Sequence, residues 1–165
     1  MGVSSVSSVA GRYTTSFFVG LLMDTALETV EPIFRDLSPS IVWRHFALLC
    51  AIPRPSKKES RLTQHLVDWA KARGLSAELD AAGNLFVRKP ASAGCESAPG
   101  VVLQAHLDMV CQANAGTVHD FERDPIRPRV ADGWLRADET TLGADNGIGV
   151  ALALAALEDD SLQHG

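Results

Sequence analysis

The stretch that decides the fold is VVLQAHLDMV at residues 101–110. Its first three side chains form a continuous apolar run, mostly β-branched, which is typical of a strand buried on both faces of a sheet. The polar residues that follow lie where open α/β sheets place their ligands, outside the carboxyl ends of the strands. Because alternate residues of an extended segment point the same way, we expect His106 and Asp108 to share one face.

Local patterns predict helices and short strands on both sides of this stretch. Two segments before it carry apolar residues at helical spacing; the first begins with Ser38 as its N-cap, and the second with Ser56 and Glu59 as a capping box. The predicted order is helices at 38–52 and 56–74, strands at 75–80, 85–88, 101–103 and 133–137, and a helix at 146–157. Helices interleaved with strands predict an α/β layered domain.

Length and composition exclude several classes of protein. The chain has 165 residues, 46% of them hydrophobic and 21% charged, which is close to the globular average and argues against disorder or fibrous structure. Twenty acidic residues against fifteen basic ones give a net charge of −5, which argues against binding to nucleic acid. The three scattered cysteines indicate no disulfide framework and favour a reducing compartment. No apolar run reaches the roughly 20 residues of a membrane helix.

The two ends of the chain differ from its middle. Residues 1–22 are rich in serine and carry one charge, Arg12, so we interpret residues 1–36 as a disordered N-terminal extension, with Met23 as a plausible start. A targeting signal is the alternative. Residues 37–165 then form the folded part, which we expect to be an incomplete domain, because the segment from Ser161 onward begins a new element and stops.

Two clusters of polar residues are candidates for chemistry. In the first, a neutral imidazole at His106 is a good zinc ligand, and the Asp108 carboxylate can hold its other ring nitrogen; an ordinary hydrogen bond at a strand end is the alternative. The second cluster is TTLGADNGIG at residues 140–149. There Asp145 is either the N-cap of the following helix or a metal ligand on a glycine-flanked turn. The glycines do not match a phosphate-binding loop.

Five motifs in a fixed order resemble one enzyme family. They are IPRPS at 52–56, the GN turn at 83–84, VLQAHLDMV at 102–110, VHDF at 118–121 and TTLGADNGIG at 140–149. Together they are similar to the aminoacyl-histidine dipeptidases, also called cytosol non-specific dipeptidases or peptidase D, which are two-zinc metallopeptidases. The resemblance covers residues 37–165. It implies the N-terminal part of a zinc-peptidase-like catalytic domain, with a mixed central sheet flanked by helices and the lid domain absent.

The resemblance also implies roles for individual residues. His106 binds one zinc ion, Asp145 bridges both, and Asp108 is the catalytic residue that orients and polarises the imidazole. Mn²⁺ or Co²⁺ could replace Zn²⁺. For His119 and Asp120 we expect a structural or pocket-lining part and no metal ligation.

The reaction implied is metal-assisted hydrolysis of Xaa-His and other dipeptides, with a glutamate as general base. In the family that glutamate, further ligands and the lid lie downstream of the residues present here, so we expect the 165-residue chain to be inactive alone. The implied partner is a dipeptide substrate, with no nucleic acid or membrane partner. The location is cytoplasmic, and the full-length protein is expected to form a homodimer. The alternatives are a non-catalytic binding module derived from the peptidase, or a related dizinc deacylase or tripeptidase.

Overall fold

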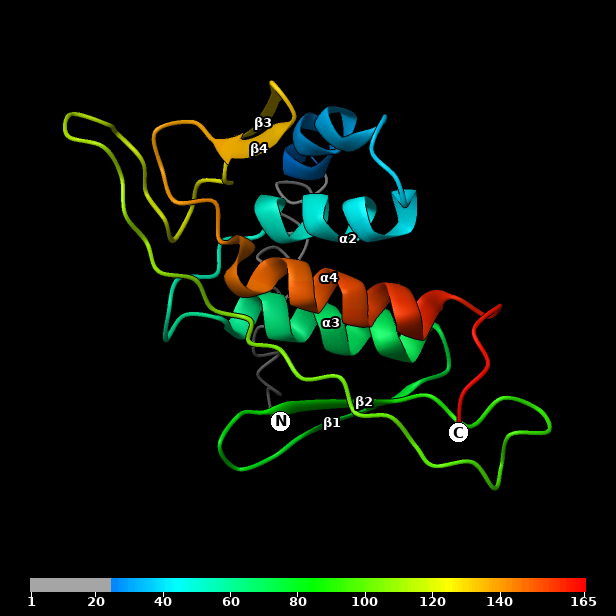
Figure 1. Cartoon of the computed structure of the whole chain (residues 1–165). Coiled ribbons are helices and arrows are strands. Elements are labelled where there is room, and N and C mark those ends of the chain that lie inside the picture. The colour runs from blue at the N-terminus through cyan, green and yellow to red at the C-terminus, as the bar shows by residue number, and fades with distance from the viewer. Residues whose placement is uncertain (1–24) are drawn as a thin grey trace, which may run out of the picture.

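The structure is a computed structural model that describes residues 25–165. Its helices are η1 (Glu31–Phe34), α2 (Ser40–Ala51), α3 (Ser60–Ala72) and α4 (Ala144–Glu158), and residues 25–30 are also helical. Its strands are β1 (Ser76–Leu79), β2 (Leu85–Arg88), β3 (Pro128–Ala131) and β4 (Trp134–Ala137). Figure 1 shows α2, α4 and α3 stacked as a layer of helices, with the β1–β2 pair beyond α3 and the β3–β4 pair near η1 and α2.

The hydrophobic core lies where α2 packs against α4. Phe46 and Leu49 of α2 are fully buried there and meet the alanine-rich face of α4, which includes Ala151. Alanine side chains are short, so the two helices can approach closely. The Phe46 ring also packs edge-on against Phe34 and Trp43, with ring centroids 5.8 and 6.2 Å apart. The core therefore joins segments from both ends of the described chain.

The two sheets are separate antiparallel hairpins. In β1–β2, Ser76 pairs with Arg88, and the Asp80 carboxylate closes the turn by accepting hydrogen bonds from the backbone N–H of Ala82 and Asn84 at 2.9 and 2.8 Å. In β3–β4, Asp132 and Gly133 form the turn with positive φ angles of 53° and 75°, as a two-residue hairpin requires. The predicted strands at 75–80, 85–88 and 133–137 are confirmed within a residue or two, whereas β3 was not predicted.

The predicted buried strand at 101–103 is wrong. Val101, Val102 and Leu103 are 72%, 90% and 58% exposed and belong to no strand. An apolar run is buried as a strand only where other strands pair with its backbone and further elements cover its faces. The described residues provide neither for this segment, which runs extended and largely in solvent.

Both helix starts differ from the predicted ones. The N-cap of α2 is Pro39, one residue after the predicted Ser38. The helix α3 begins at Ser60, and the capping box predicted at Ser56 does not form. The Ser56 hydroxyl instead donates to Asp108, and the Glu59 carboxylate accepts from the backbone N–H of Lys57 at 2.6 Å. A tertiary contact thus replaces the local cap.

The structure also bears on the predicted extension at 1–36. Residues 1–24 lie outside the described part of the chain. Residues 25–36 differ from the expected disorder, because Val30 and Phe34 are buried in the core beside α2. Apolar side chains at helical spacing are enough to hold this segment on the domain. Over the described residues, no helix has the length and apolar character needed to cross a membrane.

Candidate metal centre

Two segments far apart in the sequence meet at the candidate site. One is the extended stretch that carries His106 and Asp108, and the other is the turn that leads into α4 and carries Asp145. The His106 Nε2 atom lies 3.2 Å from Asp145 Oδ1, and its Nδ1 atom lies 2.9 Å from Asp108 Oδ1. The structure therefore brings together all three residues that the sequence singled out, with the imidazole between two carboxylates.

The turn before α4 presents Asp145 to solvent. Gly143 has a positive φ of 70°, and Asp145 and Asn146 have non-helical dihedral angles, so the regular helix begins at Gly147. The Asp145 side chain is 96% exposed and contacts His106, while α4 has no side-chain cap hydrogen bond at its start. The N-cap interpretation of Asp145 therefore does not hold, and the carboxylate remains accessible to a ligand.

Gly149 leaves room for the side chain of Asn146 in the same turn. A Cβ atom at position 149 would overlap the Asn146 side-chain amide. With glycine there, the amide fits against the backbone. The glycine spacing noted in the sequence thus serves the turn geometry and does not form a phosphate cradle.

The Asp108 carboxylate is held from two sides. The Ser56 hydroxyl donates to Oδ2 at 2.5 Å, and the His106 ring contacts Oδ1. The pKa of Asp108 is lowered, chiefly by the hydrogen bond from Ser56 and further by the hydrogen bond and charge of His106, against a smaller opposing effect of burial. Asp108 is consequently ionised at neutral pH and accepts hydrogen bonds with both oxygens.

The electrostatics of His106 follow from its two carboxylate neighbours. Loss of solvent is the largest single influence on its pKa and lowers it, but the hydrogen bonds with Asp145 and Asp108 together outweigh this, so the pKa is raised. The imidazolium form donates to both carboxylates. A cation at Nε2 would take the place of one proton, because a metal ligand must be deprotonated.

The geometry fits a small divalent metal ion. Ligand atoms bound to one tetrahedral zinc at about 2.0–2.2 Å lie roughly 3.3–3.5 Å from each other. The 3.2 Å between His106 Nε2 and Asp145 Oδ1 is close to that separation. Imidazole and carboxylate suit Zn²⁺, Mn²⁺ and Co²⁺. Among residues 25–165, however, no group of three or more histidine, cysteine, aspartate or glutamate side chains gathers to hold a metal. A catalytic zinc takes three protein ligands, and this pair provides two.

The second histidine motif takes no part in this arrangement. His119 packs against Phe121 with ring centroids 4.4 Å apart, and Asp120 accepts a hydrogen bond from the backbone N–H of Glu122 at 3.0 Å. The first contact is aromatic packing and the second closes a turn. Both are of the structural kind that the sequence predicted for them.

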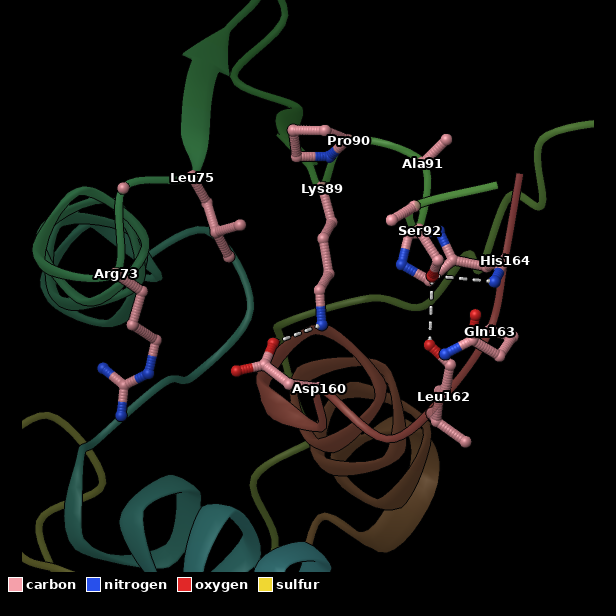
Figure 2. A pocket seen from close by; sticks show the side chains of 12 residues that line it. Arg73, Leu75, Lys89, Pro90, Ala91, Ser92, Asp160, Leu162, Gln163 and His164 are labelled. Atoms are coloured by element: carbon pink, nitrogen blue, oxygen red, sulfur yellow. Dashed lines mark hydrogen bonds and ion pairs between the residues drawn. The ribbon is translucent and has the colours of Figure 1, made fainter. Parts of the chain in front are cut away.

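A pocket of roughly 500 Å³ lies away from these residues, between the end of α3, the segment after β2 and the residues that follow α4 (Figure 2). Its basic side chains are already paired. Lys89 Nζ lies 3.0 Å from Asp160 Oδ1, and Arg73 pairs with Glu158 at 3.5 Å. Ser92 and His164 join the two sides of the pocket through a hydrogen bond of 3.0 Å. The pocket therefore offers no free charge to a ligand, and it contains none of the candidate site residues.

Sequence reasoning missed two residues that support the site. Ser56 was assigned to a helix cap but donates to Asp108, and Arg54 is buried behind the site with hydrogen bonds to both segments. Both lie in the IPRPS motif at 52–56. The motif pointed to the region, but no local pattern shows which distant group each side chain contacts.

Comparisons with known proteins agree with the motifs. The chain is 54% identical over 130 residues to the cytosol non-specific dipeptidase of Escherichia coli strain K12, which covers 79% of this chain. Its structure resembles the crystal structure of the aminoacylhistidine dipeptidase of Vibrio alginolyticus, with a TM-score of 0.78, 49% identity and 80% of this chain covered. The chain spans 27% of the length of each of these two proteins. No protein-family model matches it.

Both of these relatives are dipeptidases by name. The chain is similar in sequence and in structure to these two proteins, so the resemblance found in its motifs is confirmed. The predicted α/β class is confirmed as well, since the helices and small sheets match that fold.

Proposed function

We propose that this chain supplies two metal ligands and their support to the active site of a dizinc dipeptidase. The observation that carries the proposal is the approach of His106 Nε2 to Asp145 Oδ1 at 3.2 Å, a separation that one small metal ion can bridge. Homology to dipeptidases supports it independently, because peptide hydrolysis at neutral pH is a reaction that paired metal ions promote.

Each residue has a distinct part in this proposal. His106 would bind one ion through Nε2, and Asp145, with its exposed carboxylate, would bridge that ion to the second. Asp108 accepts the Nδ1 proton of His106, which fixes the tautomer and directs the Nε2 lone pair toward the metal. Ser56 keeps the Asp108 carboxylate in place for this purpose.

When bound, the two zinc ions would lower the pKa of a water molecule and polarise the scissile carbonyl. The chain's own residues hold and orient the ligands, and among the described residues no hydrogen bond or ion pair joins a glutamate to His106 or Asp145. We infer that the base and the remaining ligands belong to the part of the relatives outside the matched 27%. The 165-residue chain alone is then inactive.

The remaining features of the proposal concern substrate and setting. The substrates are Xaa-His and other dipeptides, as the names of the two relatives suggest. A cytoplasmic location is supported by the name of the Escherichia coli relative and by three free cysteines, Cys50, Cys95 and Cys111. We further propose a homodimer for the full-length protein, with no nucleic acid or membrane partner.

Metal binding by the chain tests the ligand assignment. We expect Co²⁺, followed by calorimetry and visible absorption, to bind the 165-residue chain with release of protons in the pH range where His106 is protonated. His106→Ala and Asp145→Ala should each abolish this binding. His65→Ala, on α3 and away from the site, is the matched control. Unchanged Co²⁺ binding in His106→Ala would refute the assignment.

Activity tests the wider proposal. A protein that joins this chain to the remaining length of its relatives should hydrolyse Xaa-His dipeptides when supplied with Zn²⁺ or Mn²⁺, and the 165-residue chain should not. Asp108→Asn should lower the rate while the protein stays folded. Turnover by the 165-residue chain alone would contradict the assignment of the base and missing ligands to the rest of the protein.

A further inference from the structure

The guanidinium of Arg54 is a charge in the interior of the domain. Arg54 is 1% exposed, although it lies between two prolines in a segment that joins α2 to α3. A buried charge is costly unless other groups replace its water. Here four backbone carbonyl groups accept hydrogen bonds from the guanidinium, and none of its hydrogen bonds goes to a carboxylate.

The hydrogen bonds of Arg54 reach both segments of the candidate metal centre. Nη1 donates to the carbonyl oxygens of Leu107 at 2.9 Å and Asp108 at 3.3 Å, on the stretch that carries His106. Nη2 donates to the Gly143 carbonyl at 2.6 Å, two residues before Asp145. Nε donates to the Leu49 carbonyl at 3.3 Å and so anchors the group to α2. One rigid, planar side chain therefore links the two ligand-bearing segments to the core.

The glycines of the TTLGADNGIG motif leave room for this link. A Cβ atom at Gly143 would lie 2.6 Å from Arg54 Nη2, and one at Gly147 would lie 2.7 Å from the same atom. Real Cβ atoms essentially never approach a neighbour so closely. The absence of side chains at both positions therefore allows the guanidinium to reach the backbone of the turn, and this observation is independent of the hydrogen bonds.

We propose that Arg54 is a positioning residue for the metal centre, which sets the separation of His106 and Asp145 by joining the backbones on which they stand. The proposal rests on the proposed function, because it assigns a purpose to that separation. The planar fork is essential to it: guanidinium donates in several fixed directions, whereas the ammonium of lysine is a compact point charge. Lysine at position 54 keeps the charge and cannot hold both segments in register.

The test compares Arg54→Met and Arg54→Lys with Arg61→Met, a matched control at an exposed position of α3. Each 165-residue chain is titrated with Co²⁺ alone, under conditions in which circular dichroism and urea unfolding show it to be folded. We expect both Arg54 variants to bind Co²⁺ roughly 10–100-fold more weakly, the usual effect of removing a group that supports a metal ligand. Arg61→Met should bind like the parent. A residue that only stabilises the fold would leave the affinity of the folded chain unchanged.

The other possible results of this test either support or overturn the positioning role of Arg54. A folded Arg54→Met or Arg54→Lys chain that binds Co²⁺ as tightly as the parent overturns the proposal. If both variants fail to fold, ¹⁵N NMR of the parent chain tests whether the Arg54 guanidinium is held in place. Separate, slowly exchanging Nη resonances for Arg54 support the fork, and one averaged, rapidly exchanging signal overturns it.

If the parent binds no Co²⁺, the proposed function fails on its own account, and amide exchange then tests the link. The backbone N–H of Gly147 donates to the Gly143 carbonyl, and that of Met109 donates to the Arg54 carbonyl, both at 3.1 Å. The protons of these two amides should exchange with solvent faster in Arg54→Met than in Arg61→Met. Equal protection at both amides would overturn the positioning role.

Discussion

The Glu158 carboxylate at the end of α4 contacts side chains of both α2 and the end of α3. Glu158 Oε2 lies 2.8 Å from the Nε2 atom of the buried His45 on α2, and Oε1 lies 2.8 Å from Arg44 and 3.5 Å from Arg73, at the end of α3. The pKa of Glu158 is lowered: burial is the largest single influence and raises it, but Arg44, His45 and Arg73 together outweigh it. We therefore predict that Glu158→Ala destabilises the domain.

The expected loss in the free energy of unfolding is the sum of the contacts of Glu158 with His45, Arg44 and Arg73. A hydrogen bond between a charged acceptor and a buried donor contributes about 1.5–3 kcal/mol, and its removal leaves the ring N–H of His45 unpaired. The pairs with Arg44 and Arg73 are partly exposed, so each adds less than about 1 kcal/mol. The total for Glu158→Ala is then about 2–4 kcal/mol. Glu158→Gln keeps an acceptor for His45 and should lose about half as much.

Urea unfolding followed by circular dichroism measures these differences. Arg44→Met is the matched control, because it removes one exposed ion pair and leaves the bond to His45 in place; it should cost less than about 1 kcal/mol. Added salt should narrow the difference between Arg44→Met and the parent and leave most of the effect of Glu158→Ala. The reasoning is refuted if Arg44→Met destabilises the domain as much as Glu158→Ala does.

Three other predictions concern pH, the core and the exposed segment. The pKa of His45 is lowered, chiefly by burial and against the influence of Glu158, so below about pH 6.5 the unfolded chain binds more protons than the folded one. The free energy of unfolding should therefore fall as the pH drops from 7 toward 5, and urea titrations of His45→Gln should lack that part of the slope; an unchanged slope would contradict the assignment. Phe46→Ala opens a cavity at a fully buried position and should cost about 3–5 kcal/mol in the same assay, and a loss below 1.5 kcal/mol would contradict the described core. Val102→Thr should change stability by less than about 0.5 kcal/mol because the side chain lies in solvent, and a larger loss would mean that Val102 is buried.

The sequence predicted those parts of the fold that depend on residues close to each other along the chain. The spacing of Phe46 and Leu49 predicted α2, and the turn-type sequence at Ala81–Asn84 predicted the β1–β2 hairpin, because both depend on residues within a few positions of each other. The alternation of an extended segment likewise predicted the contact of His106 with Asp108.

The parts that failed depend on distant groups. Ser56 could cap α3 by its local sequence, yet its hydroxyl donates to Asp108, 52 residues away. The run at 101–103 is apolar enough for a buried strand, but burial is decided by what lies beside it. The approach of Asp145 to His106 came from the family resemblance, since spacing alone left Asp145 open between cap and ligand. For Arg54, nothing in the local pattern of Pro53-Arg54-Pro55 indicates burial.

The packing of α2 on α4 has a consequence for how the chain reaches its fold. The contact between His45 and Glu158 spans 113 residues, so the central helix pair cannot form until residue 158 has been synthesised. At about 5–20 residues per second, translation of the intervening segment takes on the order of 5–20 s. During that time the face of α2 that carries Phe46 and Leu49 is without its partner helix. Closure by α4 is thus a non-local step, and the nascent α2 surface needs protection against aggregation until it occurs.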